Sequence, residues 1–320
     1  MKLNGLHHVT AVTSNAQANV DFYTGLLGMR LVKKTVNQDD VSAYHLFYGD
    51  EVGNPGTELT FFDWPRLGPN RNGPGSIANT ALRVPGQTAL DWWARRLAEH
   101  DIKHSGIVEF HDHAMLNFTD PEGQQLTLVD DGGAPGGTPW AKSPVPAEYA
   151  IRGLFASTLI VHELEPTAYV LVEIMGYQKS AEYSSPTDAN ERTVVFSLGA
   201  GGAGNELYVI EAPNKPAGAL GKGGVHHIAF RTPNGEEQQQ WMERIHSFGL
   251  GTSGLVDRYY FQSLYFRIPG GILFEIATDG PGFATDEAAE HLGERLALPP
   301  FLEPRRAQIE AGLTPIKPAN

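Results

Sequence analysis

The sequence predicts an α+β fold made of four βαβββ modules in two domains, followed by a C-terminal helical extension. Four short apolar segments open at Gly5, Ser76, Gly153 and Gly224, roughly 71 to 77 residues apart, which is longer than a solenoid repeat. A stretch with helical apolar spacing and then further short strands follow each opening. The 36 Gly and 22 Pro lie mostly between these segments, as expected for a chain with many turns.

The elements of each module follow from periodicity. The opening strands are expected at residues 5–13, 76–84, 153–161 and 224–232. Amphipathic helices, several ending at a glycine suited to a left-handed cap, are expected at residues 15–28, 88–101, 165–176 and 235–249. The last strands are expected at residues 58–64, 124–131, 206–212 and 271–279.

A segment rich in Gly and Pro separates the second module from the third and is typical of a connector. The helical spacing of the C-terminal tail is broken at Pro299 and Pro300. These features predict an N-terminal domain at 1–131, a linker at 132–150, a C-terminal domain at 151–284 and a helical tail at 285–320.

Composition narrows the class of protein. A hydrophobic content of 41% suffices for a sizeable core, and a net charge of -13 argues against a nucleic-acid partner, because phosphate contacts need clustered Lys and Arg. The absence of Cys excludes disulfides and thiolate-ligated metals. Without a signal peptide or an apolar run of about 18 to 20 residues, a soluble cytoplasmic protein with no membrane partner is expected. The oligomeric state stays open, a homo-oligomer included.

The four modules act as controls for one another. When the opening strands are aligned, His8 and His227 correspond to Asn79 and Ala156 in the two middle modules. The fold therefore does not itself require these histidines. When the last strands are aligned on their preceding glycines, Glu275 corresponds to residues 60, 127 and 208, which are Thr, Thr and Tyr. Only the fourth module places a carboxylate there.

His8, His227 and Glu275 together fit a metal site. A single Glu in a strand more often faces solvent, but here the module that carries Glu275 also carries a histidine on its opening strand. Two His and one carboxylate form a facial triad that leaves open positions on a divalent metal, most typically non-haem Fe(II).

Each candidate ligand histidine belongs to a doublet, His7-His8 or His226-His227. Adjacent strand residues face opposite sides, so both members of a doublet cannot ordinarily bind one metal. The pattern alone does not choose between them. His7 and His226 fit either ligand-supporting groups, brought round by a twist or bulge, or histidines packed between strands.

Other polar clusters have simpler explanations. His111 and His113 could share a strand face, but their module has no matching carboxylate, so a polar turn is expected. Surface or packing roles are expected for the single histidines, which are His45, His100, His104, His162, His246 and His291. Glu58 and Glu206 occupy equivalent places, which favours a structural role, with Glu58 as the reserve metal ligand.

The phrases GLHHVTAVTSNAQANVDFYTGLLGMRLVKKTVNQDD, YHLFYGDEVGNPGTELTFFDWP and GGVHHIAFRTP, with VDRYYFQSLYFRIPGGILFEIATDGPGFATDE, resemble the vicinal-oxygen-chelate superfamily. This superfamily includes glyoxalase I, extradiol dioxygenases and antibiotic-resistance proteins. The resemblance covers essentially the whole chain and is narrowest to bacterial dioxygenases that cleave hydroquinone rings. It implies the glyoxalase/dioxygenase fold, with modules one and four facing each other.

The resemblance also implies roles for individual residues. It implies that the second histidine of each doublet and the Glu after the PGG turn bind the metal, and these are His8, His227 and Glu275. It assigns supporting and catalytic roles near the metal to His7, Thr10, His226, Arg258 and Tyr265.

The implied reaction is O2-dependent opening of a hydroquinone or catechol ring at Fe(II), with Mn(II) as the other candidate metal. In this interpretation His226 or His7 moves a proton, Tyr265 binds a substrate oxygen and Arg258 stabilises negative charge or orients an acidic neighbour. Without the resemblance, a surface ion pair for Arg258 and a packed aromatic for Tyr265 fit equally well or better.

Two rival functions use the same fold. A glyoxalase-like lyase or isomerase usually takes a second Glu ligand, where this chain has Thr60. A non-catalytic resistance protein that binds small molecules needs no metal triad, so the triad of His8, His227 and Glu275 argues against it.

Overall fold

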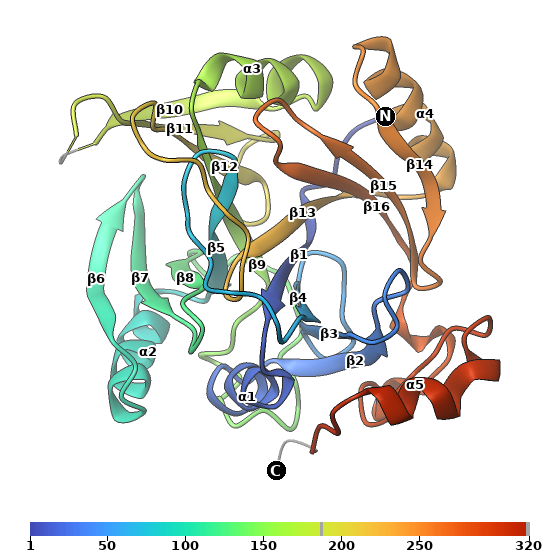
Figure 1. Ribbon diagram of the computed structural model, residues 1–320. Coiled ribbons are helices and arrows are strands. Elements are labelled where there is room, and N and C mark those ends of the chain that lie inside the picture. The colour runs from blue at the N-terminus through green and yellow to red at the C-terminus, as the bar shows by residue number, and fades with distance from the viewer. Residues whose placement is uncertain (186–187, 318–320) are drawn as a thin grey trace.

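The computed structural model describes residues 1–185 and 188–317 as four modules with one order of elements (Figure 1). The first module contains β1 (Leu6–Thr13), α1 (Ala16–Val20) continued by a π-helical turn (Asp21–Leu26), β2 (Arg30–Val36), β3 (Tyr44–Gly49) and β4 (Glu58–Asp63). The second contains β5 (Ser76–Val84), α2 (Gln87–Glu99), β6 (His104–Phe110), β7 (His113–Thr119) and β8 (Gln125–Asp130).

The other two modules repeat this order. The third contains β9 (Leu154–Val161), α3 (Leu164–Tyr169) continued by a π-helical turn (Val170–Ile174), β10 (Gln178–Ser184), β11 (Arg192–Ser197) and β12 (Glu206–Glu211). The fourth contains β13 (Val225–Thr232), α4 (Gly235–Ser247), β14 (Thr252–Asp257), β15 (Phe261–Arg267) and β16 (Leu273–Pro281). The predicted α+β class and the four modules are confirmed.

Strand order is the same in every module, because the first strand pairs in parallel with the last. These pairs are β1 with β4, β5 with β8, β9 with β12, and β13 with β16. The second and third strands continue each module outward in antiparallel pairing. The opening strand of each module therefore lies at its inner edge, where it is free to pair with another module.

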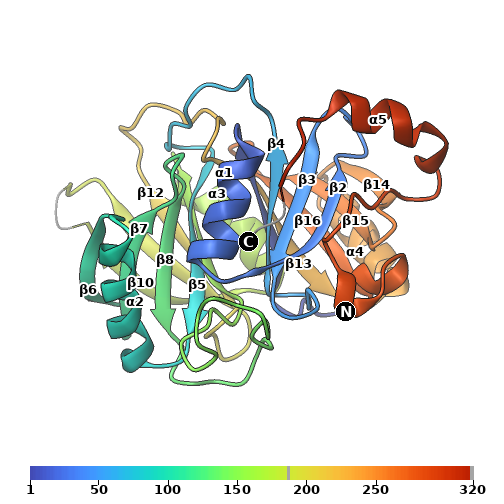
Figure 2. The ribbon, with the colours of Figure 1, turned by 90° about the horizontal axis from the view of Figure 1, so that it is seen from below.

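The modules pair one with four and two with three. Antiparallel ladders join β1 to β13 and β5 to β9, and among the described strands one ladder pair, Val225 with Ile77, links the two halves in the sheet. Figure 2 shows the strands of modules one and four on one side and those of modules two and three on the other. Each half of the molecule thus combines one module from before the connector with one from after it. This pairing is expected if ligands from modules one and four meet. The division into domains at 1–131 and 151–284, a linker at 132–150 and a tail at 285–320 stays a prediction.

Helix α4 shows why these segments form helices. Asn234 precedes it, and its side chain accepts a hydrogen bond from the Glu237 amide, which caps the first turn. Acidic residues in the first turn and basic residues in the last complement the helix dipole. Gln238, Trp241 and Ile245 recur at helical spacing and are buried against the sheet.

The C-terminal tail contains less helix than its apolar spacing predicts. It forms three short 3-10 turns (Phe283–Thr285, Ala289–His291 and Glu303–Arg305) and one short helix, α5 (Arg306–Gly312). Its buried residues, among them Leu298, Leu302 and Ile309, pack on the main core. Within the described residues, no helix has the length and apolar character needed to cross a bilayer.

Candidate metal centre

His8, His227 and Glu275 come from three adjacent strands of the paired first and fourth modules. His8 on β1 lies opposite Ala229 on β13, and Ala229 lies opposite Glu275 on β16. Paired residues of neighbouring strands share a face of the sheet, and His227 shares it too because it is two residues from Ala229. The small side chain of Ala229 leaves space between His8 and Glu275.

The three side chains meet through one atom each. Glu275 Oε2 lies 3.2 Å from His8 Nε2 and 2.9 Å from His227 Nε2, and the two Nε2 atoms are 3.4 Å apart. All three side chains are buried. Ligands at about 2.0 to 2.2 Å from one divalent cation lie roughly this far from one another. The spacing therefore matches three ligands that share a metal.

Two bulges explain how both histidines of each doublet reach the same region. The β1–β13 ladder shifts register between Leu6 and His8, which leaves His7 as the extra residue on β1. A second shift leaves His226 as the extra residue on β13. Bulges re-aim side chains and are common beside active sites. The β5–β9 ladder has the same two shifts, at Ala78 and Phe155. The bulges thus belong to the fold, and only the first and fourth modules place histidines in them.

His7 determines which nitrogen of His8 carries the proton. His7 Nε2 lies 3.1 Å from the Thr278 carbonyl oxygen, which only accepts, so His7 carries its proton on Nε2. Burial, with help from His8, lowers the pKa of His7 to about 3, so the ring is neutral and Nδ1 is an acceptor. His8 Nδ1 lies 3.0 Å from it and must donate. In the neutral ring, the lone pair is then on His8 Nε2, which is directed at Glu275.

The second doublet has the same arrangement. His226 Nδ1 and His227 Nδ1 lie 2.7 Å apart, so the two rings share one proton at this contact. Burial and His227 lower the pKa of His226 to about 3, and burial lowers the pKa of His227. Both rings are neutral, which is the form that binds metals. A proton on His227 Nδ1 leaves its Nε2 free as well.

Glu275 supplies the negative charge of the site. Burial raises the pKa of its carboxyl, but positive charge at the Nε2 atoms of His8 and His227, from a proton or from a bound cation, outweighs burial and holds the pKa well below its usual range. Oε1 accepts a hydrogen bond of 2.5 Å from Ser263, whereas Oε2 has no hydrogen-bond donor. Three lone-pair atoms within 3.4 Å of one another repel unless a cation lies between them. The donor set therefore fits a divalent metal.

A small cavity of about 40 Å³ opens onto His8 and His227. Of the residues predicted to act near the metal, Tyr265 and Arg258 line it. Tyr265 lies opposite Glu275 in the β15–β16 ladder, and Arg258 Nε lies 3.4 Å from its hydroxyl. The Arg258 guanidinium also binds both carboxylate oxygens of Asp39, at 3.1 and 2.8 Å. The Asp39 pair holds the loop after β2 across the cavity.

Three further predicted residues, His7, His226 and Thr10, are close to the triad but outside the cavity lining. The histidines contact the ligand histidines from behind. Thr10 follows His8 on the same face of β1, and its hydroxyl lies 2.8 Å from that of Thr60. All eight predicted residues thus lie in one region of the first and fourth modules.

His45 lines the cavity, although a packing or surface role was expected for it. Its Nε2 lies 3.0 Å from the Thr60 hydroxyl, and its ring packs between Phe47 and Phe62 at 3.9 and 4.4 Å. Burial, with the nearby His8 and His227, lowers its pKa well below the usual range, so it is neutral. The sequence held one indication of this position. Strand alternation puts His45 on the same face as Phe47, which is an apolar residue.

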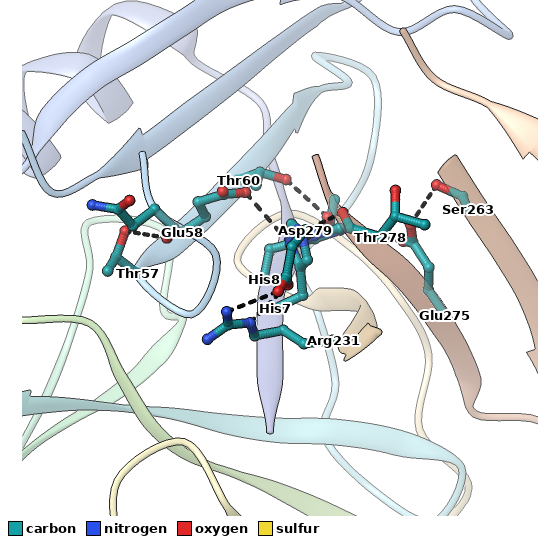
Figure 3. Close-up of polar contacts among 12 residues, drawn as sticks. His7, His8, Thr57, Glu58, Thr60, Arg231, Ser263, Glu275, Thr278 and Asp279 are labelled. Atoms are coloured by element: carbon teal, nitrogen blue, oxygen red, sulfur yellow. Dashed lines mark hydrogen bonds and ion pairs between the residues drawn. The ribbon is translucent and has the colours of Figure 1, made fainter. Parts of the chain in front are cut away.

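Glu58 forms a second group with His7 and His8 (Figure 3). Its Oε2 is buried without a hydrogen bond and lies 3.8 Å from His7 Nδ1. Burial and the nearby Asp50 raise the pKa of Glu58 well above its usual value, so the carboxyl is protonated and a poor ligand. Glu206, its counterpart, accepts hydrogen bonds from the Gly202 amide and the Tyr208 hydroxyl. The triad with Glu275 is the better metal site.

The other histidine pair lies in the second module, away from the triad. His111 has a left-handed backbone and contacts the Tyr183 hydroxyl at 2.5 Å. His113 packs edge-on against Phe155. Across residues 1–185 and 188–317, neither histidine belongs to a group of three side chains that could hold a metal. The expected polar turn agrees with this placement.

Comparisons with known proteins agree with the fold. Residues 5–128 match the family model described as Glyoxalase/Bleomycin resistance protein/Dioxygenase superfamily. The chain is 49% identical, over 99% of its length and 100% of the relative's, to MhqA of Bacillus subtilis (strain 168), provisionally named a ring-cleaving dioxygenase. It is 33% identical, over 94% of its length and 93% of the relative's, to the chlorohydroquinone/hydroquinone 1,2-dioxygenase of Sphingobium indicum.

A solved structure shows the same architecture over the whole chain. The crystal structure of a provisionally assigned dioxygenase from Bacillus subtilis has a TM-score of 0.91 and 39% identity, and covers 100% of this chain and 99% of that one. Sequence identity and architecture thus agree over the full length. The chain belongs to the glyoxalase/bleomycin resistance protein/dioxygenase superfamily, and its full-length relatives include a provisionally named ring-cleaving dioxygenase and a hydroquinone 1,2-dioxygenase.

Proposed function

We propose that the chain is a non-haem, metal-dependent dioxygenase that opens a hydroquinone-type ring with O2 at a metal held by His8, His227 and Glu275. The observation that carries the proposal is the meeting of three lone-pair atoms, Nε2, Nε2 and Oε2, within 3.4 Å in a buried site. The name of the Sphingobium indicum relative supports hydroquinones over catechols as the substrate class.

Dioxygenases of this superfamily imply a divalent metal, and we propose Fe(II). Two His and one carboxylate leave positions for substrate and O2, and this set is typical of non-haem Fe(II). Mn(II) accepts the same ligands and is the alternative. The metal would supply the redox chemistry that the side chains lack.

The residues that line the cavity would bind and orient the substrate. Phe47, Phe62 and Phe261 would pack on the ring. The Tyr265 hydroxyl, whose pKa is raised by burial and the nearby Glu275, stays protonated and can donate to a substrate oxygen. His45 can hydrogen-bond a second hydroxyl of the ring through Nδ1. Arg258 lies at the same wall and balances negative charge.

The roles of His7 and His226 are to orient the ligand histidines. Both ring nitrogens of His7 already have partners, Thr278 and His8, so proton transfer to substrate is not open to it. His226 contacts His227 from behind and does not line the cavity. Hydrogen bonds to ligand histidines fix the tautomer and raise metal affinity.

The proposed reaction balances without a further reductant. The product contains every atom of the hydroquinone and of O2, because one ring C–C bond breaks and both oxygen atoms enter the ring-opened acid aldehyde. The four electrons that reduce O2 come from the ring itself. The only co-substrate is O2, so turnover consumes one O2 per ring.

The test is anaerobic reconstitution of metal-free protein with Fe(II) or Mn(II), followed by O2 uptake on hydroquinone, methyl- and chlorohydroquinone, and catechol. We expect one metal per chain and O2 uptake on hydroquinones above that on catechol. Glu275→Gln and His227→Ala should lose metal and turnover together, whereas the exposed His291→Ala should retain both.

Two outcomes would contradict the proposal. If no metal binds stoichiometrically, or if Glu275→Gln keeps full turnover, the triad is not the site. If a methylglyoxal–thiol adduct disappears without O2 uptake, the chain is an isomerase of the glyoxalase kind. No specific contact in the site favours that reaction, and Thr60 lies where module one would supply its second carboxylate.

A further inference from the structure

A second, polar cavity of about 540 Å³ lies where the two halves of the molecule meet. It is bounded by the starts of β1 and β9, by the turns before β4 and β12, and by linker residues 135–138. It shares no lining residue with the cavity at the candidate metal centre. Its volume lies within the range of small-molecule sites.

Three arginines line this cavity, and two of them have carboxylate partners. Arg83 Nε binds Asp131 at 2.6 Å, and Arg231 binds both oxygens of Asp279 at 2.8 and 3.0 Å. Arg231 and Asp279 appear together in Figure 3. The two pairs stand at equivalent places in the second and fourth modules, at the ends of β5 and β8 and of β13 and β16. They are repeated structural pairs, and the Nη1 atom of each arginine has no hydrogen bond to a described residue.

The third arginine, Arg152, has no such partner. Among residues 1–185 and 188–317, no carboxylate lies within 4 Å of its guanidinium, and its Nε is buried without a hydrogen bond. Its counterpart before β1 is Asn4, so the repeat does not require an arginine here. The cavity thus has three guanidiniums and two paired carboxylates, an excess of positive charge in a chain of net charge -13.

We propose that this cavity is a binding site for a small oxyanion, a carboxylate or a phosphate, with Arg152 as its main contact. A guanidinium presents parallel N–H donors that match two oxygens of either group. The free Nη1 atoms of Arg83 and Arg231 and the side chains of Asn4 and Asn205 provide further donors around it. An oxyanion bound to the terminal nitrogens of the Arg152 guanidinium balances the surplus charge.

The test is calorimetric titration of the full chain with succinate and, separately, with inorganic phosphate at constant ionic strength. We expect saturable binding near one ligand per chain for at least one probe, with a dissociation constant in the millimolar range or tighter. The probe that binds more tightly identifies the source of the oxyanion as organic or inorganic. Arg152→Gln should weaken binding about tenfold or more, and Arg152→Lys by less.

Arg95→Gln is the matched control, because Arg95 is exposed on α2 and its loss removes the same charge. It should leave binding unchanged. Thermal denaturation of each variant without ligand checks that it is folded. Absence of saturable binding for both probes would overturn the proposal, as would equal binding by Arg152→Gln and the unmodified chain. Because the readout is binding without metal or O2, failure here is distinct from failure of the proposed dioxygenase function.

Discussion

His7 and His8 contact each other through their Nδ1 atoms, 3.0 Å apart, because β1 carries a bulge at His7. The Thr278 carbonyl fixes the proton of His7, and His7 in turn fixes that of His8. The lone pair of neutral His8 is therefore directed at Glu275 from Nε2 by a residue that lies outside the candidate triad. This relay gives the doublet a function that neither histidine has alone.

Replacing His7 by Leu should lower metal affinity about 10- to 100-fold, since the tautomer and orientation of His8 are no longer held. The measurement is competition with a chelator of known affinity. The exposed His291→Leu is the control and should bind metal as the unmodified chain does. Unchanged affinity in His7→Leu would show that the relay does not support the ligand.

Replacing His45 by Phe should raise the KM for hydroquinone about tenfold, at a cost of about 1.4 kcal/mol, which is typical of one lost hydrogen bond. Phe keeps the packing between Phe47 and Phe62 but cannot hydrogen-bond the substrate. Steady-state kinetics and metal content are measured together. Loss of metal, or unchanged kinetics with full metal content, would contradict a substrate-binding role.

Replacing Asp39 by Asn should speed entry of the substrate by a factor of about two to five. The cavity of about 40 Å³ is too small for an aromatic ring, so the loop that Asp39 ties to Arg258 must move first. Asp39 is 72% exposed, so its ion pair contributes about 1 kcal/mol or less. Anaerobic stopped-flow binding of hydroquinone measures this, with Asp40→Asn as control. Slower or unchanged entry would mean that the pair does not close the cavity.

Replacing Asp63 by Asn should stabilise the protein at neutral pH. Burial, with help from Glu122, raises the pKa of Asp63 from 3.8 to about 6. Below pH 3.8 both the folded and the unfolded chain hold this proton. Between pH 3.8 and about 6 the unfolded chain releases it more readily than the folded chain does, so the free energy of unfolding falls as the pH rises. Asn does not ionise, so the variant should avoid this loss of stability. The expected gain in the free energy of unfolding is about 1 kcal/mol, after allowance for the exposed part of Asp63.

The measurement for Asp63→Asn is urea unfolding at about pH 4 and about pH 7.5, on either side of the raised pKa. The variant should match the unmodified chain at the lower pH and exceed it at the higher. An equal difference at both values would show that the effect is not the ionisation of Asp63.

The sequence was sufficient to predict the four modules, because they repeat one order of elements. Comparison of the copies singled out the two histidine doublets and Glu275 as residues that the fold does not need, and the family resemblance chose His8 and His227 within the doublets. Periodicity could not show that modules one and four share a ladder, since strand pairing across 219 residues depends on tertiary packing. The pairing of modules one and four was instead inferred from the candidate ligands, which lie in those two modules.

Features that depend on the register between strands could not be predicted from the sequence. The bulges at His7 and His226 appear only when β1 and β13 are paired, and they decide which way each doublet points. His45 looked like an isolated histidine because its contacts, Thr60 and Phe62, lie on a neighbouring strand. The helical spacing of the tail also overstated its helix, because its apolar residues pack as short turns around Pro299 and Pro300.

The most direct test of the central claim is incorporation of labelled oxygen during turnover of hydroquinone by the Fe(II)-loaded chain under 18O2. The account predicts a ring-opened product that carries both labelled atoms, with one O2 consumed per ring. Benzoquinone or hydrogen peroxide as the product, with no label in the carbon skeleton, would show that the site oxidises the ring without cleaving it and would contradict the account.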